Sequence, residues 1–157
     1  MIYLGKEVNF MKVLIDADGC PVVDITVRLC QKHKIDCIIF CDTAHEMHRD
    51  GATTLTFDKG ADSVDFALVN RVEKGDIVVT QDYGLASMCL AKEATILHQD
   101  GWEYTPYNID ALLFQRHESK VYRAAGGRIK GPAKRKNGQD KAFEIAFEKL
   151  LQQSVQG

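Results

Sequence analysis

Five aspartates lie close to the ends of apolar segments, and they are the residues best suited to do chemistry. They are Asp16, Asp18, Asp62, Asp65 and Asp82. Asp16 and Asp18 follow one apolar run, and Asp82 follows another. Parallel sheets form crevices at the carboxyl ends of their strands, so side chains placed there can meet. If the first and fourth strands are neighbours, we expect Asp16 and Asp82 to lie side by side.

Carboxylates held together repel one another, and a cation between them removes that cost. Hard oxygen ligands suit Mg²⁺ or Mn²⁺. One or two such ions acidify water and stabilise the charge of a reacting phosphodiester. We therefore predict phosphodiester hydrolysis, with all five aspartates as metal ligands. The predicted catalytic residues are Asp16, Asp62, Asp65 and Asp82. Asp16 and Asp82 are expected to bind the ion directly, and Asp62 and Asp65 to hold a second ion or orient water.

Each aspartate also has a purely structural interpretation. Asp62 and Asp65 are spaced to cap a helix and to favour its first turn. Asp18-Gly19 is typical of a turn, and Asp82 is placed to cap the helix after it. The functional interpretation depends on all of these residues falling at junctions that one sheet would bring together.

Other residues with reactive side chains give weaker signals. His45 and His48 have zinc-like spacing, but no convincing third ligand accompanies them, which favours ordinary surface histidines. Cys20 precedes a predicted helix, where its pKa can fall, but no histidine partner is identifiable and a packed thiol is favoured. The sequence contains no P-loop, dinucleotide fingerprint or G-x-S-x-G motif.

Strand-like and helix-like segments alternate along the chain, which predicts an α/β fold. Helices on both faces of a mostly parallel sheet of about five strands follow from this order. The expected strands cover residues 12–16, 36–41, 53–57, 77–80 and 94–98. The expected helices cover 22–33, 62–72, 85–92, a segment from 109, and a last amphipathic segment containing 142–151. Residues 42–51 are expected to form a loop or a short helix.

Length and composition predict one soluble domain. The chain has 157 residues, of which 45% are hydrophobic and 27% charged, as in ordinary globular proteins. We expect residues 1–10 to be an extension and 11–153 to be the single domain. No leader or membrane-spanning run is recognisable. The five cysteines are best explained as buried thiols in a reducing cytoplasm.

The charge is distributed unevenly. Residues 120–141 contain eight basic side chains and one aspartate, a net charge of +7, so the remainder of a chain of net charge −2 carries about −9. A basic segment beside an acidic body suits a polyanionic ligand. A solvated surface loop is the plainer interpretation of the same charges.

Several motifs together are specific enough to suggest a family. They are Asp16-Ala-Asp-Gly-Cys-Pro-Val22, Lys59-Gly-Ala-Asp-Ser-Val-Asp65, Gly75-Asp-Ile-Val-Val-Thr-Gln-Asp-Tyr-Gly-Leu-Ala86, Gly131-Pro132 and Asp140-Lys-x-Phe143. From about Met11 to Leu151 the chain resembles the YaiI/YqxD family of uncharacterised bacterial proteins, which is similar to PIN domains.

The resemblance implies a PIN-like α/β/α sandwich of three layers with an acidic site. In PIN nucleases such carboxylates hold Mg²⁺ or Mn²⁺ and cut RNA or DNA. Carried over by position, they are Asp16, Asp62 or Asp65, and Asp82, with Asp18 as an extra. The doublet Asp16-x-Asp18 followed by Cys-Pro departs from the usual PIN opening. The substrate therefore rests on analogy of fold and carboxylates.

The function we expect is that of a metal-dependent, nuclease-like hydrolase. Arg123, Arg128 and Lys130 are predicted to bind the phosphate backbone of RNA or DNA, and Thr80 and Ser63 to hydrogen-bond ligand carboxylates. A non-catalytic nucleic-acid or nucleotide binding module is the alternative, and a phosphatase-like hydrolase is a third. The sequence leaves the oligomeric state open and is compatible with a dimer.

Overall fold

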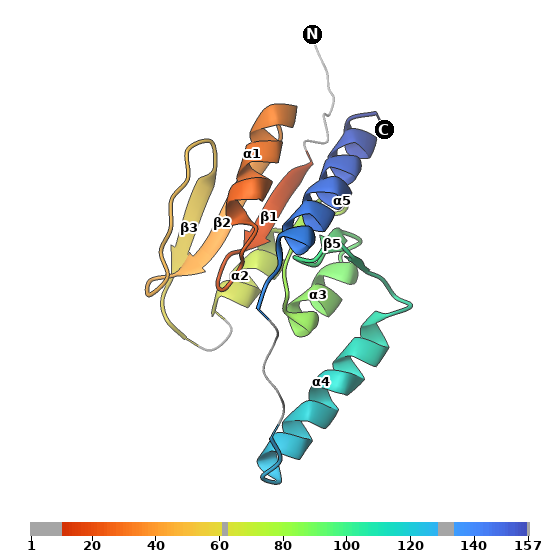
Figure 1. Cartoon of the computed structure of the whole chain (residues 1–157). Helices are drawn as coiled ribbons and strands as arrows, with labels where there is room; N and C mark the ends of the chain where they lie inside the picture. The colour runs from red at the N-terminus through yellow and green to blue at the C-terminus, as the bar shows by residue number, and fades with distance from the viewer. Residues whose placement is uncertain (1–10, 61–62, 129–133, 157) are drawn as a thin grey trace.

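The fold is built on one mostly parallel sheet with helices on both faces (Figure 1). This computed structural model describes residues 11–60, 63–128 and 134–156. The sheet order is β3-β2-β1-β4-β5-β6. The strands are β1 (Lys12–Asp16), β2 (Asp36–Asp42), β3 (Thr53–Phe57), β4 (Ile77–Val79), β5 (Thr95–Leu97) and β6 (Glu103–Tyr104).

The strand that carries Asp16 lies in the middle of the sheet. β1 pairs in parallel with β2 on one side and with β4 on the other. The first and fourth strands are therefore neighbours, which is the condition under which Asp16 and Asp82 were expected to lie side by side. Ile15 is in register with Val79, so Asp16 and Thr80 are the next residues at the same edge. The short β6, which pairs antiparallel with β5, was not predicted.

The helices form the two outer layers. They are α1 (Val23–His33), α2 (Ser63–Arg71), α3 (Tyr83–Leu90), α4 (Ile109–Ala124) and α5 (Asn137–Gln156). Alternate residues of β1 point to opposite faces: Val13 and Ile15 belong to the core under α1 and α5, and Leu14 belongs to the core under α2 and α3. The predicted sandwich of three layers is confirmed.

Helix α5 is tied to α1 at the edge of the sheet where β1 begins. Glu148 accepts hydrogen bonds from Lys32 Nζ at 2.6 Å and pairs with His33 Nε2 at 2.8 Å. Both partners lie in the last turn of α1. The C-terminal part of α5 therefore lies at the edge opposite to that of Asp16, as Figure 1 shows.

Helix α4 extends away from the rest of the molecule (Figure 1). Of its 16 residues only Ile109 is buried, and the exposed side chains include Phe114, Val121 and Tyr122. Its N-terminal part packs on α3. The outer part of the helix therefore has little protein around it.

Three details of the chain differ from or refine the expectations. Residues 43–52 form turns and no helix. Helix α3 begins at Tyr83, two residues earlier than predicted, because Asp82 caps it. The five cysteines are free thiols, and four of them are buried as predicted, whereas Cys20 is half-buried. Within the described segments, no helix has the length and apolarity needed to cross a membrane.

Candidate functional site

Carboxylates from separate junctions line one small cavity at the carboxyl edge of the sheet. Its volume is about 240 Å³. The aspartates in its wall are Asp16, Asp18, Asp42, Asp65 and Asp82. The structure thus brings together four of the five aspartates singled out in the sequence. The fifth, Asp62, lies outside the described residues.

Thr80 joins the ends of the two central strands. Its hydroxyl donates a hydrogen bond to Asp16 Oδ2 at 2.7 Å and accepts one from the Asp82 backbone N–H at 3.0 Å. Thr80 is 1% exposed, whereas Asp16 is partly buried and lines the cavity. The predicted role of Thr80 as a partner of a carboxylate is confirmed, and Asp16 is held in one orientation.

The environment of Asp16 disfavours its negative charge. Burial is the main cause that raises the pKa of this carboxyl from 3.8 to about 6, and the charges of Asp65, Asp82 and Asp18 raise it further. The hydrogen bond from Thr80 acts in the opposite direction and lowers this pKa. Asp16 is therefore a partly buried carboxyl among like charges, an environment that a positive ligand would relieve.

Asp82 caps a helix, as its structural interpretation predicted. Its Oδ1 accepts hydrogen bonds from the backbone N–H groups of Gly84 at 2.8 Å and Leu85 at 3.1 Å. Arg116 of α4 places Nη1 3.4 Å from the same oxygen. The cap fixes the carboxylate at the mouth of the cavity, so the structural role and a role in the site are compatible.

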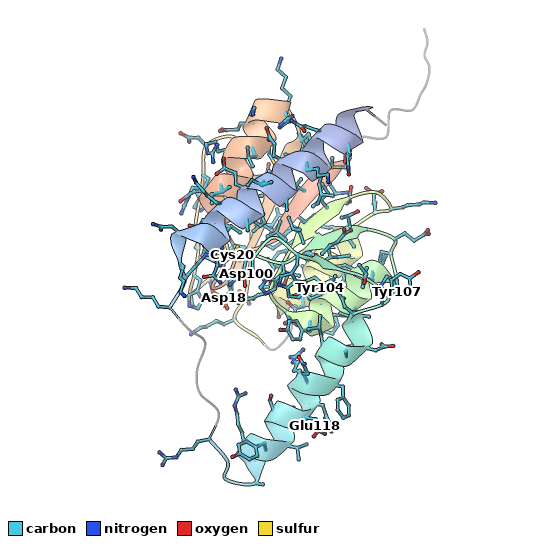
Figure 2. The ribbon with its side chains drawn as sticks, turned by 45° about the vertical axis from the view of Figure 1, so that its right-hand side comes forward. Asp18, Cys20, Asp100, Tyr104, Tyr107 and Glu118 are labelled. Carbon is cyan, nitrogen blue, oxygen red and sulfur yellow. The ribbon has the colours of Figure 1, made fainter. Side chains whose placement is uncertain are left out.

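On the opposite side of the cavity, Asp18 and Asp42 face His45. Asp18 lies in the turn after β1 at the end of the sheet (Figure 2), and Asp42 is the last residue of β2. His45 Nδ1 is 3.0 Å from Asp42 Oδ1 and 3.6 Å from Asp18 Oδ1. Sequence reasoning missed Asp42 because the residue was assigned to the start of a polar loop.

A groove beside the cavity is lined by basic residues of α4. Its volume is about 480 Å³, and its wall includes Asp82, Arg116 and Arg123. Arg116 was not predicted; its position about two helical turns before Arg123 was the only signal. Arg128 is exposed beyond the end of α4. Lys130 lies outside the described residues.

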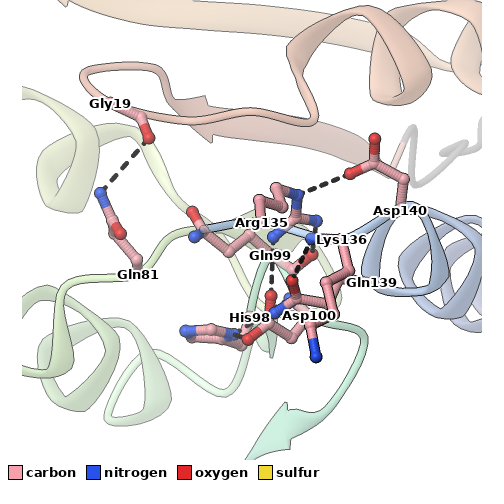
Figure 3. Close-up of polar contacts among 9 residues, drawn as sticks. All are labelled: Gly19, Gln81, His98, Gln99, Asp100, Arg135, Lys136, Gln139 and Asp140. Carbon is pink, nitrogen blue, oxygen red and sulfur yellow. Dashed lines mark hydrogen bonds and ion pairs between the residues drawn. The ribbon is translucent and has the colours of Figure 1, made fainter. Parts of the chain in front are cut away.

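One member of the basic segment serves the fold instead of a ligand (Figure 3). Arg135 donates hydrogen bonds to Asp140 Oδ1 at 2.6 Å, to Asp100 Oδ1 at 2.7 Å and to the carbonyl oxygen of Gln99 at 2.7 Å. Its charge is therefore neutralised where the chain enters α5. The net charge of +7 overstates the positive charge that a ligand would meet.

In the described part of the chain, Cys20 is not an activated thiol, and His45 and His48 do not form a pair. Burial raises the pKa of the Cys20 thiol to about 11, so Cys20 is protonated near neutral pH and is not an activated thiolate. His48 Nε2 contacts Glu46 at 2.7 Å, whereas His45 contacts Asp18 and Asp42. The two histidines therefore do not act as a pair.

Comparison with known proteins identifies the family. The sequence profile described as "Uncharacterized BCR, YaiI/YqxD family" matches residues 14–153. The chain belongs to the YaiI/YqxD family. All the motifs that suggested the resemblance fall within this match.

Relatives in the family match over nearly their whole length. A UPF0178 protein of Exiguobacterium sibiricum is 53% identical over 141 residues, which cover 90% of this chain and 96% of the relative. UPF0178 proteins of Natranaerobius thermophilus and Ruminiclostridium cellulolyticum are 43% and 46% identical, over 91% and 94% of this chain and 97% and 96% of theirs. No solved structure matches the chain.

The donor set of the cavity fits a hard divalent cation. Its wall offers carboxylate oxygens from β1, β2, α2 and the cap of α3, and no thiolate is needed. Mg²⁺ and Mn²⁺ prefer such ligands. The like charges around Asp16, which raise its pKa, give the physical reason for a cation.

Proposed function

We propose that this member of the YaiI/YqxD family is a PIN-like, divalent-metal-dependent phosphodiester hydrolase acting on RNA or DNA. The observation that carries the proposal is the convergence of Asp16, Asp18, Asp65 and Asp82 on one cavity. A basic groove with Arg116 and Arg123 begins at that cavity. Five free thiols, four of them buried, support a reducing, cytoplasmic location.

Each group has a role that its position supports. Asp16 and Asp82 would hold the ion, because their orientations are fixed by Thr80 and by the N-terminus of α3. A bound Mg²⁺ or Mn²⁺ would acidify water and stabilise the charge of the reacting phosphate. Asp65 would orient the attacking water, and Arg123 would bind a neighbouring phosphate of the nucleic acid.

Cleavage of generic single-stranded RNA and DNA in Mn²⁺ tests the proposal. The wild type is expected to cleave, and Asp16→Asn is expected to cleave at least tenfold more slowly because the variant loses a charged ligand. Asp36→Asn is the matched control: the same change at an exposed residue at the other end of the sheet should have no effect. Equal cleavage by all three proteins would identify a contaminating nuclease and refute the proposal.

A binding module without catalysis is the second candidate. The contacts of Asp82 favour it. Asp82 Oδ1 already accepts two backbone hydrogen bonds and faces Arg116, which is typical of a carboxylate with a structural role. Binding of the same oligonucleotides in EDTA, with no cleavage in Mn²⁺, would support this candidate over the hydrolase.

Replacement of Arg123 by alanine tests the basic groove. We expect weaker binding of single-stranded nucleic acid and a plot of log affinity against log salt that is shallower by about 0.7, the value for one lost phosphate contact on a single strand. Lys149→Ala, which removes an exposed charge from α5, should change neither quantity. An unchanged slope for Arg123→Ala would exclude this residue from the binding surface.

A further inference from the structure

Two carboxylates and an imidazole meet at the side of the cavity farther from α4. One ligand atom from each of Asp18, Asp42 and His45 lies within 4.8 Å of the other two. The three residues come from the turn after β1 and from the end of β2 with the turn that follows it. Neither Asp42 nor His45 belongs to the ligand set expected from the sequence.

The two separations from His45 are close to those between the ligands of a bound transition metal. With metal–ligand bonds of about 2.1 Å, two ligand atoms lie about 3.0 Å apart at an octahedral right angle and about 3.4 Å apart at a tetrahedral one. His45 Nδ1 lies 3.0 Å from Asp42 Oδ1 and 3.6 Å from Asp18 Oδ1. The three ligand atoms, all within 4.8 Å of one another, are therefore close enough to share one cation after small side-chain movements.

The orientation of His45 distinguishes it from the other histidine of the same loop. His48, which is similarly exposed, contacts the single carboxylate of Glu46 at 2.7 Å. His45 instead presents one nitrogen to two carboxylates, and both of these belong to the wall of the cavity. Asp42 is itself held by the backbone, because its Oδ1 accepts hydrogen bonds from the N–H groups of Ala44 and His45.

We propose that Asp18, Asp42 and His45 form a site for a transition metal of the Mn²⁺ or Co²⁺ class, in preference to Mg²⁺. An imidazole nitrogen adds little to Mg²⁺, which prefers oxygen, whereas it strengthens the binding of transition metals. This inference deepens the proposed function and rests on it for the presence of a divalent ion in the cavity. It adds Asp42 and His45 to the ligands and names the class of ion.

Calorimetric titration of the full chain with MnCl₂, CoCl₂ and MgCl₂ at constant pH tests the site. The wild type is expected to bind Co²⁺ and Mn²⁺ more tightly than Mg²⁺. His45→Gln should weaken Co²⁺ binding at least tenfold and Mg²⁺ binding less than twofold. His48→Gln is the matched control, because it removes an exposed imidazole from the same loop, and it should leave all affinities unchanged. Asp42→Asn should weaken Co²⁺ binding as well.

The visible absorption of bound Co²⁺ gives a second readout that does not depend on catalysis. The spectrum should change in His45→Gln and stay unchanged in His48→Gln, since only the former loses a nitrogen ligand. Equal affinities and spectra for wild type and His45→Gln would overturn the inference.

The two proposals fail in different ways. Cleavage that requires Asp16 but is accompanied by metal binding independent of His45 would overturn this inference and leave the proposed function intact. A protein that binds none of the three ions would overturn this inference and the metal dependence of the proposed function together.

Discussion

The Asp16→Asn variant is expected to be more stable than the wild type at pH 7 in EDTA, by about 2–3 kcal/mol. Burial and neighbouring carboxylates raise the pKa of Asp16 from 3.8 to about 6, and each unit corresponds to about 1.4 kcal/mol. Asparagine removes the charge and keeps an oxygen that can accept the hydrogen bond of Thr80. The charged form of Asp16, which is proposed to be needed for cleavage, would then lower the free energy of unfolding.

The gain should depend on pH in a defined direction. Below about pH 4 Asp16 is protonated in both the folded and the unfolded chain, so the charge costs nothing. Between about pH 4 and 6 the folded protein retains a proton that the unfolded chain has lost, and the stability contributed by this group falls as pH rises. Above pH 6 the difference between variant and wild type should be constant.

Urea unfolding at pH 4, 5, 6 and 7 measures this difference. Asp36→Asn, with its carboxyl exposed at the far end of β2, should stay within about 0.5 kcal/mol of the wild type at each pH. Mn²⁺ at pH 7 should stabilise the wild type more than it stabilises Asp16→Asn. A variant that is less stable than the wild type at pH 7, or a difference that does not change with pH, would contradict the environment described for Asp16.

The Asp76→Ala variant is expected to lose about 3–5 kcal/mol of stability, the usual cost of removing one partner of a buried ion pair. Asp76 is 3% exposed. Its Oδ2 accepts hydrogen bonds from Lys12 Nζ and from the Glu73 N–H, both at 2.8 Å, and its Oδ1 accepts one from the Lys12 N–H at 3.2 Å. Alanine would leave the backbone N–H groups of Lys12 and Glu73 without this acceptor, and the Lys12 ammonium with the exposed carboxylate of Glu73 alone.

Glu73→Ala provides the control for this prediction. Glu73 contacts the same ammonium at 2.7 Å, but its side chain is 79% exposed, and exposed pairs contribute about 0–1 kcal/mol. Chemical denaturation at pH 7 should therefore separate the two variants by several-fold in their loss of stability. Similar losses of stability in both variants would show that the buried contacts of Asp76 contribute no more than the exposed contact of Glu73.

The arrangement of the aspartates was predictable because it follows from strand order. A buried β1 and β4 with carboxylates just beyond them places Asp16 and Asp82 at one edge whenever the two strands pair in parallel. Short apolar runs, and the threonine-rich run of β3, were sufficient to locate β1 to β5. Thr80 was predictable for the same reason, since it occupies the end of β4 opposite Asp16.

The residues that were missed depend on tertiary contacts without a local pattern. Asp42 belongs to β2 by pairing with Phe57, although its polar sequence context indicates a loop. Arg116 reaches Asp82 only because α4 packs on α3. The two-residue β6 is too short for a periodic signal and is defined by its pairing with β5.

The placement of α5 indicates where the protein can be attached to a solid surface. Glu148 binds α1 at the edge of the sheet where the strands begin, while the cavity lies where they end. A fluorophore or biotin attached near the C-terminal end of α5 would be separated from the cavity by the length of β1. This length is about 16 Å at 3.3 Å per residue. The protein can thus be immobilised through that helix with its acidic mouth facing the solution.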